Sequence, residues 1–181
     1  MKNQGKVFEA DFTKSVPAYV GVLRIPDAAQ SFYRSPQLRF SNKNPFDFIF
    51  WNPHSLTLYA LELKTVKGKS ISFERTKEDH GEIHYHQVVG LDKFGRIGEC
   101  VCGFVIEFRE IVKTIFLPIG EFMKLQDAIT KKSFTINDLD DNGINYILIP
   151  QSIVITHYRY DVKQFLNETA LHGGMEVLDE V

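Results

Sequence analysis

Two carboxylates and a lysine are the residues in this sequence whose types and spacing could do chemistry. The segment Thr57–Thr65 has the composition of a β-strand, and the two-residue period of a strand places Glu62 and Lys64 on one face. That face is apolar before Glu62 and becomes charged only near its end. If a turn at residues 53–56 joins this strand to the preceding one, Asp47 lies directly opposite Glu62.

This arrangement predicts hydrolysis assisted by a metal ion. Directly opposed side chains on paired strands have Cβ atoms roughly 4.5 to 5.5 Å apart, and oxygen ligands at that spacing suit Mg²⁺ or Mn²⁺. Lys64 could orient a water molecule or stabilise a pentacovalent phosphate. The alternative is purely structural: a surface salt bridge of Glu62 with Lys64 or Lys67, with Asp47 as a capping residue.

The elements that must position these residues predict a mixed α/β chain forming one domain over residues 1–181. Strands are expected at Phe46–Trp51, Thr57–Thr65, Cys100–Phe108, Lys113–Leu117, Ile144–Ile149 and Ile153–Thr156. Helices are expected at Val7–Lys14, Ile83–Lys93, Phe122–Lys131 and Asp161–His172. The first helix carries a further carboxylate, Glu9.

Residues 22–44 differ from the rest and predict a projecting loop or stalk. Pro26 and Pro36 interrupt regular structure in this segment. Between and around them lies a group of basic and aromatic residues that could contact phosphates or stack on bases: Arg24, Phe32, Tyr33, Arg34, Arg39 and Lys43. An ordinary loop packed on the core is the alternative. Lys67 and Lys69 could likewise contact a DNA backbone or form a solvated turn.

The charge of the chain is unevenly distributed. The formal net charge of −2 argues against recognition by bulk positive charge. However, residues 1–75 carry 11 basic and 6 acidic side chains, whereas residues 76–181 carry 10 and 17. The first half therefore predicts an anionic partner. The 44% apolar composition excludes a disordered chain, and no apolar run approaches the roughly 20 residues of a membrane span.

Several short motifs, taken in order, resemble a known family. Asn44-Pro45-Phe46-Asp47 followed by Glu62-Leu63-Lys64 is similar to the signature of PD-(D/E)XK nucleases, and Glu9 resembles their helix-borne acidic residue. Ile83-His84-Tyr85-His86-Gln87 is similar to a helix of RecU-type Holliday junction resolvases. The segments Gly103–Phe108, Thr114–Leu117 and Phe134–Asp140 also correspond in order.

The resemblance implies a restriction-endonuclease-like core and a homodimeric, Mg²⁺-dependent endonuclease that nicks branched DNA at four-way junctions. It implies that Asp47, Glu62 and the Leu63 carbonyl bind metal, that Lys64 assists the attacking water, and that Glu9 and Gln87 complete the site. The stalk is shorter than in the family and differs in composition, and the basic N-terminal extension is absent. The compact size and the truncated N-terminus suggest a phage enzyme. A nuclease of the same core with another DNA target, or a non-catalytic DNA-binding module, remains an alternative.

Other groups of metal-binding residue types are less informative. His80 and His84 are four residues apart, but Gly81 weakens a helix there and no third zinc ligand follows. The acidic group Asp138, Asp140 and Asp141 lacks the spacing of a calcium loop and is expected to form a turn. Cys100 and Cys102 are expected to face the same side of a strand as free thiols. Together with the polar N-terminus, this usage of cysteine predicts a cytosolic protein with no membrane partner.

Overall fold

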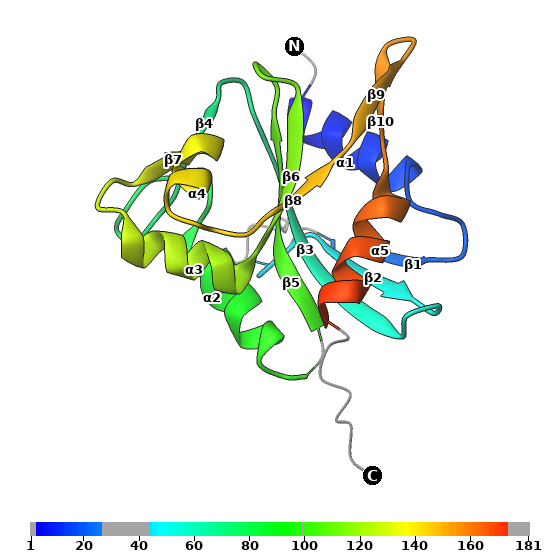
Figure 1. The fold of residues 1–181 in the computed structure, drawn as a ribbon, viewed down its shortest axis with the longest axis horizontal. Helices are drawn as coiled ribbons and strands as arrows, with labels where there is room; N and C mark the ends of the chain where they lie inside the picture. The colour runs from blue at the N-terminus through cyan, green and yellow to red at the C-terminus, as the bar shows by residue number, and fades with distance from the viewer. Residues whose placement is uncertain (1–2, 27–43, 99, 174–181) are drawn as a thin grey trace, which may run out of the picture.

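A six-stranded mixed sheet runs through the middle of the computed structural model, which describes residues 3–26, 44–98 and 100–173 (Figure 1). The central pair, β3 and β5, is parallel, and every other neighbouring pair in this sheet is antiparallel. Across the sheet the order is β1 (Gly21–Arg24), β2 (Phe48–Asn52), β3 (Thr57–Val66), β5 (Cys100–Phe108), β6 (Lys113–Pro118) and β8 (Ile147–Ile149).

Helices cover both faces of this sheet, which confirms the predicted α/β class. On one face lie α2 (Tyr85–Gly95) and α3 (Ile119–Ala128), and on the other lie α1 (Gln4–Lys14) and α5 (Val162–Gly173) (Figure 1). Each pair of helices buries its apolar residues in a separate core, one on each side of the sheet. A sheet with both faces covered is the arrangement that the resemblance to restriction endonucleases implied.

Strand β3 lies between these two cores, and successive side chains of the strand point into one core and then the other. Ala60 packs in the core under α2 and α3, whereas Leu61 and Leu63 pack in the core under α1 and α5. The hairpin with β2 has the predicted register, since Trp51 pairs with Leu58. The pattern of apolar residues fixes this register, because a slip by one residue would turn every side chain to the opposite face.

Smaller elements flank the sheet. β4 (Ser70–Ser72) pairs with β7 (Ser133–Thr135), and β9 (Gln151–Val154) pairs with β10 (His157–Tyr160) as a hairpin. In Figure 1 the β9–β10 hairpin projects beside α1, and its second strand is tied to that helix by the Arg159 Nη1 bond to the Lys14 carbonyl, 3.0 Å long. No helix in the described part of the chain is long and apolar enough to cross a membrane.

Some sequence-based boundaries were wrong. The segment expected as a projecting loop or stalk begins too early, because its first residues belong to Gly21–Arg24, a strand at the sheet edge. Residues 27–43 of that segment lie outside the described residues. The acidic segment expected as a turn is helix α4 (Ile136–Asp141), because Thr135 accepts the Asp138 amide at its start. The strand expected at Ile153–Thr156 ends at Val154. Helix α3 begins three residues earlier than predicted, and α2 begins two residues later.

Candidate active site

The predicted carboxylates meet at the carboxyl end of β3, where β2 begins. Asp47 immediately precedes β2, and its Oδ2 accepts a hydrogen bond from the Leu63 amide at 3.1 Å. The side chain of Asp47 therefore accepts from β3 at the position where the next residue of a paired strand would do so. Glu62 lies on the face of β3 covered by α2 and is 3% exposed. The structure thus brings Asp47, Glu62 and Leu63 together, as the sequence predicted.

Glu62 is held by two donors on the same oxygen. Lys64 Nζ lies 3.0 Å from Glu62 Oε1, and the side-chain amide of Gln87 also donates to Oε1. Burial raises the pKa of Glu62 to about 7, with Lys64 opposing the rise and Asp47 adding to it. Glu62 therefore exchanges its proton near neutral pH.

Asp47 is perturbed in the same direction. Burial raises the pKa of Asp47, and the Leu63 amide opposes that rise. The negative charge of Glu9 raises the pKa of both Asp47 and Glu62, so Glu9 belongs to the same electrostatic group. Its own carboxylate pairs with Arg24, whose Nε lies 3.0 Å from Glu9 Oε2. Helix α1 and the edge strand β1 thereby bring a further predicted site residue, Glu9, and the predicted DNA-binding residue Arg24 to the site.

The chain has a relative of known name. It is 30% identical over 156 residues to the SPbeta prophage-derived uncharacterized protein YotM of Bacillus subtilis (strain 168), an alignment covering 83% of this chain and 72% of YotM. The chain belongs to the YotM family. No model of a protein family matches the sequence. Among solved structures, Hjc, a Holliday junction resolvase of Archaeoglobus fulgidus, is similar with a TM-score of 0.46 and 15% identity, over 74% of this chain and 88% of that one.

The orientation of Gln87 in this YotM-family protein depends on residues that sequence reasoning did not place in the site. Gln87 Oε1 accepts the His84 amide at 2.9 Å, which directs its NH₂ group to Glu62. His84 is the residue that precedes α2, and its Nδ1 lies 2.8 Å from Glu74 Oε1. The Tyr85 amide donates to the second oxygen of Glu74, also at 2.8 Å. Glu74 therefore anchors the start of the helix that carries Gln87.

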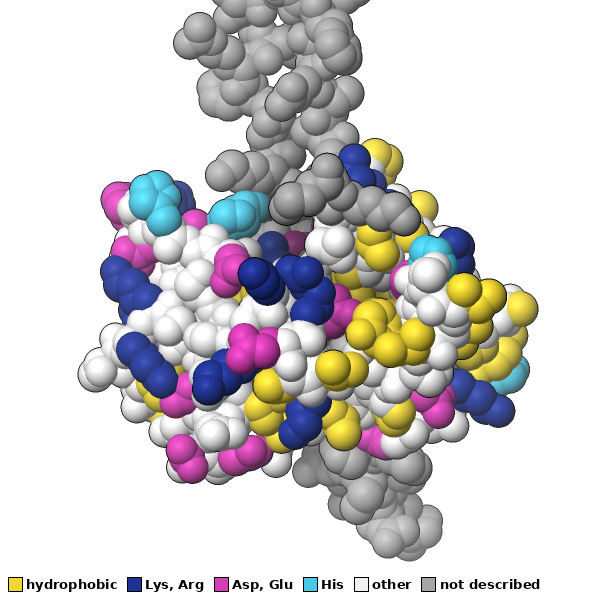
Figure 2. All heavy atoms as spheres, turned by 90° about the horizontal axis from the view of Figure 1, so that it is seen from above, with side chains coloured by type: hydrophobic (Ala, Val, Ile, Leu, Met, Phe, Trp, Pro, Cys, Tyr) yellow, Lys and Arg dark blue, Asp and Glu magenta, His cyan; other side chains and the backbone are white. Residues whose placement is uncertain are grey.

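The remaining predicted DNA-binding residues are divided between the described and the undescribed parts. Lys67 and Lys69 are exposed at the turn between β3 and β4. This turn belongs to the face shown in Figure 2, where Lys and Arg side chains gather near the centre among acidic ones. Phe32, Tyr33, Arg34, Arg39 and Lys43 lie outside the described residues.

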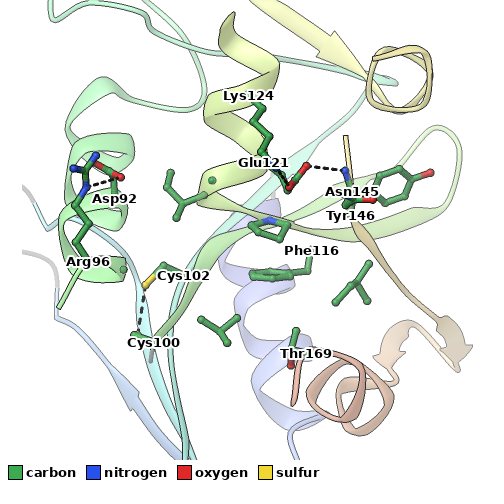
Figure 3. Close-up of a pocket in the computed structure, with 16 residues that line it drawn as sticks. Asp92, Arg96, Cys100, Cys102, Phe116, Glu121, Lys124, Asn145, Tyr146 and Thr169 are labelled. Carbon is green, nitrogen blue, oxygen red and sulfur yellow. Dashed lines mark hydrogen bonds and ion pairs between the residues drawn. The ribbon is translucent and has the colours of Figure 1, made fainter. Parts of the chain in front are cut away.

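A cavity of about 750 Å³ lies elsewhere and contains none of these residues. It opens between α2, α3, β5 and the segment leading to β8, and its lining is mainly apolar (Figure 3). Cys100 and Cys102 line it as free thiols with their Sγ atoms 3.5 Å apart, on the same side of β5 as predicted. The candidate active site is the group of carboxylates around Glu62, and this mainly apolar cavity lies apart from it.

Proposed function

We propose that the protein is a metal-dependent endonuclease that hydrolyses DNA phosphodiester bonds at the carboxyl end of β3. The observation that carries this proposal is the convergence of Asp47, Glu62 and Lys64 on two paired strands, with Gln87 bound to Glu62 from a helix. A surface salt bridge does not account for it, because Glu62 is buried and its pKa is raised to about 7. Raised pKa values of buried carboxylates favour a functional site over a structural one.

The donor atoms of the site fit Mg²⁺ or Mn²⁺. Within the described residues, Asp47 Oδ1 and Glu62 Oε2 accept no hydrogen bond. The N–H and C=O groups of a strand residue point to the same side, so the Leu63 carbonyl faces the side on which Asp47 binds its amide. In the described chain no three His, Cys, Asp or Glu side chains enclose a metal by themselves. Mg²⁺ commonly uses one or two carboxylates together with water and substrate phosphates.

The other residues of the site have distinct roles in this proposal. Bound Mg²⁺ or Mn²⁺ would supply Lewis-acid stabilisation of the phosphate and a more acidic water. Lys64 places a positive charge 3.0 Å from Glu62, where it can orient the attacking water and offset charge that develops on the phosphate oxygens. Gln87 holds the Glu62 carboxylate in one orientation. The negative charge of Glu9 adds to the repulsion between Asp47 and Glu62. A cation bound between these carboxylates relieves that repulsion, so Glu9 favours its binding.

We propose branched DNA, and four-way junctions in particular, as the substrate and a homodimer as the active form. The order of the sequence motifs and the basic, aromatic composition of residues 22–44 support this choice. Paired nicks in opposite strands need two active sites, which a two-fold symmetric dimer supplies. Duplex, flap and fork DNA are the competing substrates.

A strand-resolved cleavage assay tests both levels of the proposal. Wild-type protein is incubated with a mobile four-way junction and with duplex, flap and fork DNA of matched length, with Mg²⁺ or with a chelator. Asp47→Asn and Glu62→Gln should abolish cleavage, whereas Asp92→Asn, which alters an exposed ion pair with Arg96, should leave it intact. Symmetric nicks on the junction support a resolvase; equal cleavage of all substrates overturns the junction preference. Absence of any Mg²⁺-dependent cleavage overturns the proposed endonuclease activity.

A further inference from the structure

A groove of about 790 Å³ lies between helix α1 and the edge strand β1, next to the candidate active site. Its helix wall carries Lys6, Ala10, Thr13 and Lys14, which recur at the spacing of one helix face. Its opposite wall is formed by Val22 and Arg24, and Phe48 of β2 completes the lining. The sequence offered no sign of this groove, because its two walls are brought together only by the fold.

The groove continues into the reaction centre. Glu9 lines it on the helix side and Arg24 on the strand side, and the two are joined by the 3.0 Å ion pair that borders the carboxylate group. Lys6 lies before Glu9 on the helix and Lys14 lies after it. At 1.5 Å per residue, these two lysines are about 12 Å apart along the helix axis, which corresponds to roughly three to four nucleotides of a DNA strand.

The charges of the groove suit an anionic polymer. Lys6 and Lys14 are both exposed, and within the described residues neither ammonium pairs with a carboxylate. Val22, 39% exposed, adds an apolar surface of the kind that sugar rings can contact. The groove therefore has two available cations, Lys6 and Lys14, one on each side of Glu9 along the helix. Val22 gives it an apolar wall opposite them.

We propose that this groove binds the DNA backbone flanking the scissile phosphate, with Lys6 and Lys14 contacting phosphates on opposite sides of it. This proposal rests on the endonuclease activity proposed above and deepens it, because it gives the path of the DNA strand along α1. Phosphate contacts fix the position of DNA and depend on salt, whereas they carry no base specificity. Binding through the groove should therefore be independent of sequence and weaken steeply with salt.

Binding of labelled duplex DNA in the presence of a chelator tests this path independently of catalysis. The slope of log affinity against log salt concentration is negative, and its magnitude should decrease by about 0.9 for each of Lys6→Gln and Lys14→Gln, while affinity at 50 mM salt should fall roughly tenfold. Lys163→Gln, an exposed lysine on α5 outside the groove, is the matched control and should leave the slope unchanged.

A second pair of variants tests the charge of the groove without removing a lysine: one variant adds a negative charge and the other is its neutral control. Ala10 is exposed in the middle of the groove wall, so Ala10→Glu should weaken binding several-fold whereas Ala10→Gln, of the same size, should not. The groove is not the DNA path if both lysine variants keep the wild-type salt dependence, or if Lys163→Gln loses as much affinity as they do. Because these measurements need no hydrolysis, they can fail while the cleavage assay succeeds, and the two proposals are separately tested.

Discussion

The ammonium of Lys64 lies 3.0 Å from Oε1 of Glu62, two residues apart on the same face of β3. Both side chains are largely withdrawn from water, with 16% and 4% of their surfaces exposed. Gln87 donates to the same oxygen, and it is the only other hydrogen-bond donor to Glu62 among the described residues. The charged form of Glu62 is therefore stabilised mainly by one lysine, so replacing that lysine should have effects on both stability and chemistry.

Replacing Lys64 should destabilise the protein in a pH-dependent manner. Lys64→Met leaves the buried Glu62 carboxylate without its cation, and an unsatisfied buried group costs about 1–3 kcal/mol. The free energy of unfolding, measured with urea, should fall by this amount at pH 8 and by less at pH 5, where Glu62 is protonated. Lys163→Met on the exposed face of α5 is the control. An equal loss at both pH values would show that the aliphatic part of Lys64, and not its charge, is what matters.

Glu62 should also give the wild-type protein a characteristic pH dependence. Its pKa is about 7 in the folded protein and 4.5 in the unfolded chain, so the folded state keeps the proton to higher pH. The favourable contribution is complete below pH 4.5 and is lost as pH rises through 7, a total of about 3 kcal/mol. Urea unfolding between pH 4 and 8 should show this decrease, and Glu62→Gln should lack it.

Cleavage should change in the opposite direction over the same interval, because a metal ligand must be deprotonated. The rate of DNA cleavage should rise through pH 7 while the free energy of unfolding falls. A rate that is flat between pH 6 and 8, with substrate saturating but metal well below saturation, would contradict the role of Glu62 as a ligand, because only then does the proton compete with the metal for Glu62.

The hairpin and its register could be predicted from the sequence, because local information determines them. The turn at residues 53–56 and the alternation in β3 together allow one pairing, and Trp51 does pair with Leu58. The convergence of Asp47 with Glu62 follows from that register. Gln87 was predicted through the resemblance of its motif, and the structure places it on Glu62.

Features that depend on distant parts of the chain were missed. The pairing of Ser70–Ser72 with Ser133–Thr135 joins two three-residue strands that are too short to show a period. Glu74 carries no local signal either, since its partners His84 and Tyr85 are reached only when the chain folds back. The groove beside α1 likewise exists only because β1 pairs with β2.

Gly90 should tolerate no side chain, even though it lies within helix α2. A Cβ atom there would lie 2.2 Å from Cβ of Pro45, two residues before Asp47. Gly90→Ala should therefore push α2 away from the segment that carries Asp47, at a cost of about 1–3 kcal/mol that outweighs the gain of about 1 kcal/mol in helix propensity. Thermal unfolding should show a lower Tm, and DNA cleavage should fall because Gln87 and Asp47 are separated.

Gly120 provides the matched control for this substitution. It lies in α3, and a Cβ atom there would have no neighbour within 4 Å. Gly120→Ala should leave cleavage unchanged and raise stability by up to about 1 kcal/mol. If both alanine variants were stabilised alike, the close approach of α2 to Pro45 would not exist in solution.

Divalent metal should stabilise the folded protein through the same carboxylates, which gives a readout that does not depend on cleavage. A ligand that binds only the folded state at 100 times its Kd adds about 2.7 kcal/mol to the free energy of unfolding. Mn²⁺ or Mg²⁺ should therefore raise the Tm of the wild-type protein, more at pH 8 than at pH 6, because Glu62 has a pKa of about 7. Asp47→Asn should abolish the rise, whereas Asp92→Asn should retain it, and a chelator should reverse it. A rise in Tm that persists in Asp47→Asn would place the metal at another site, and Asp47 and Glu62 would then not be its ligands.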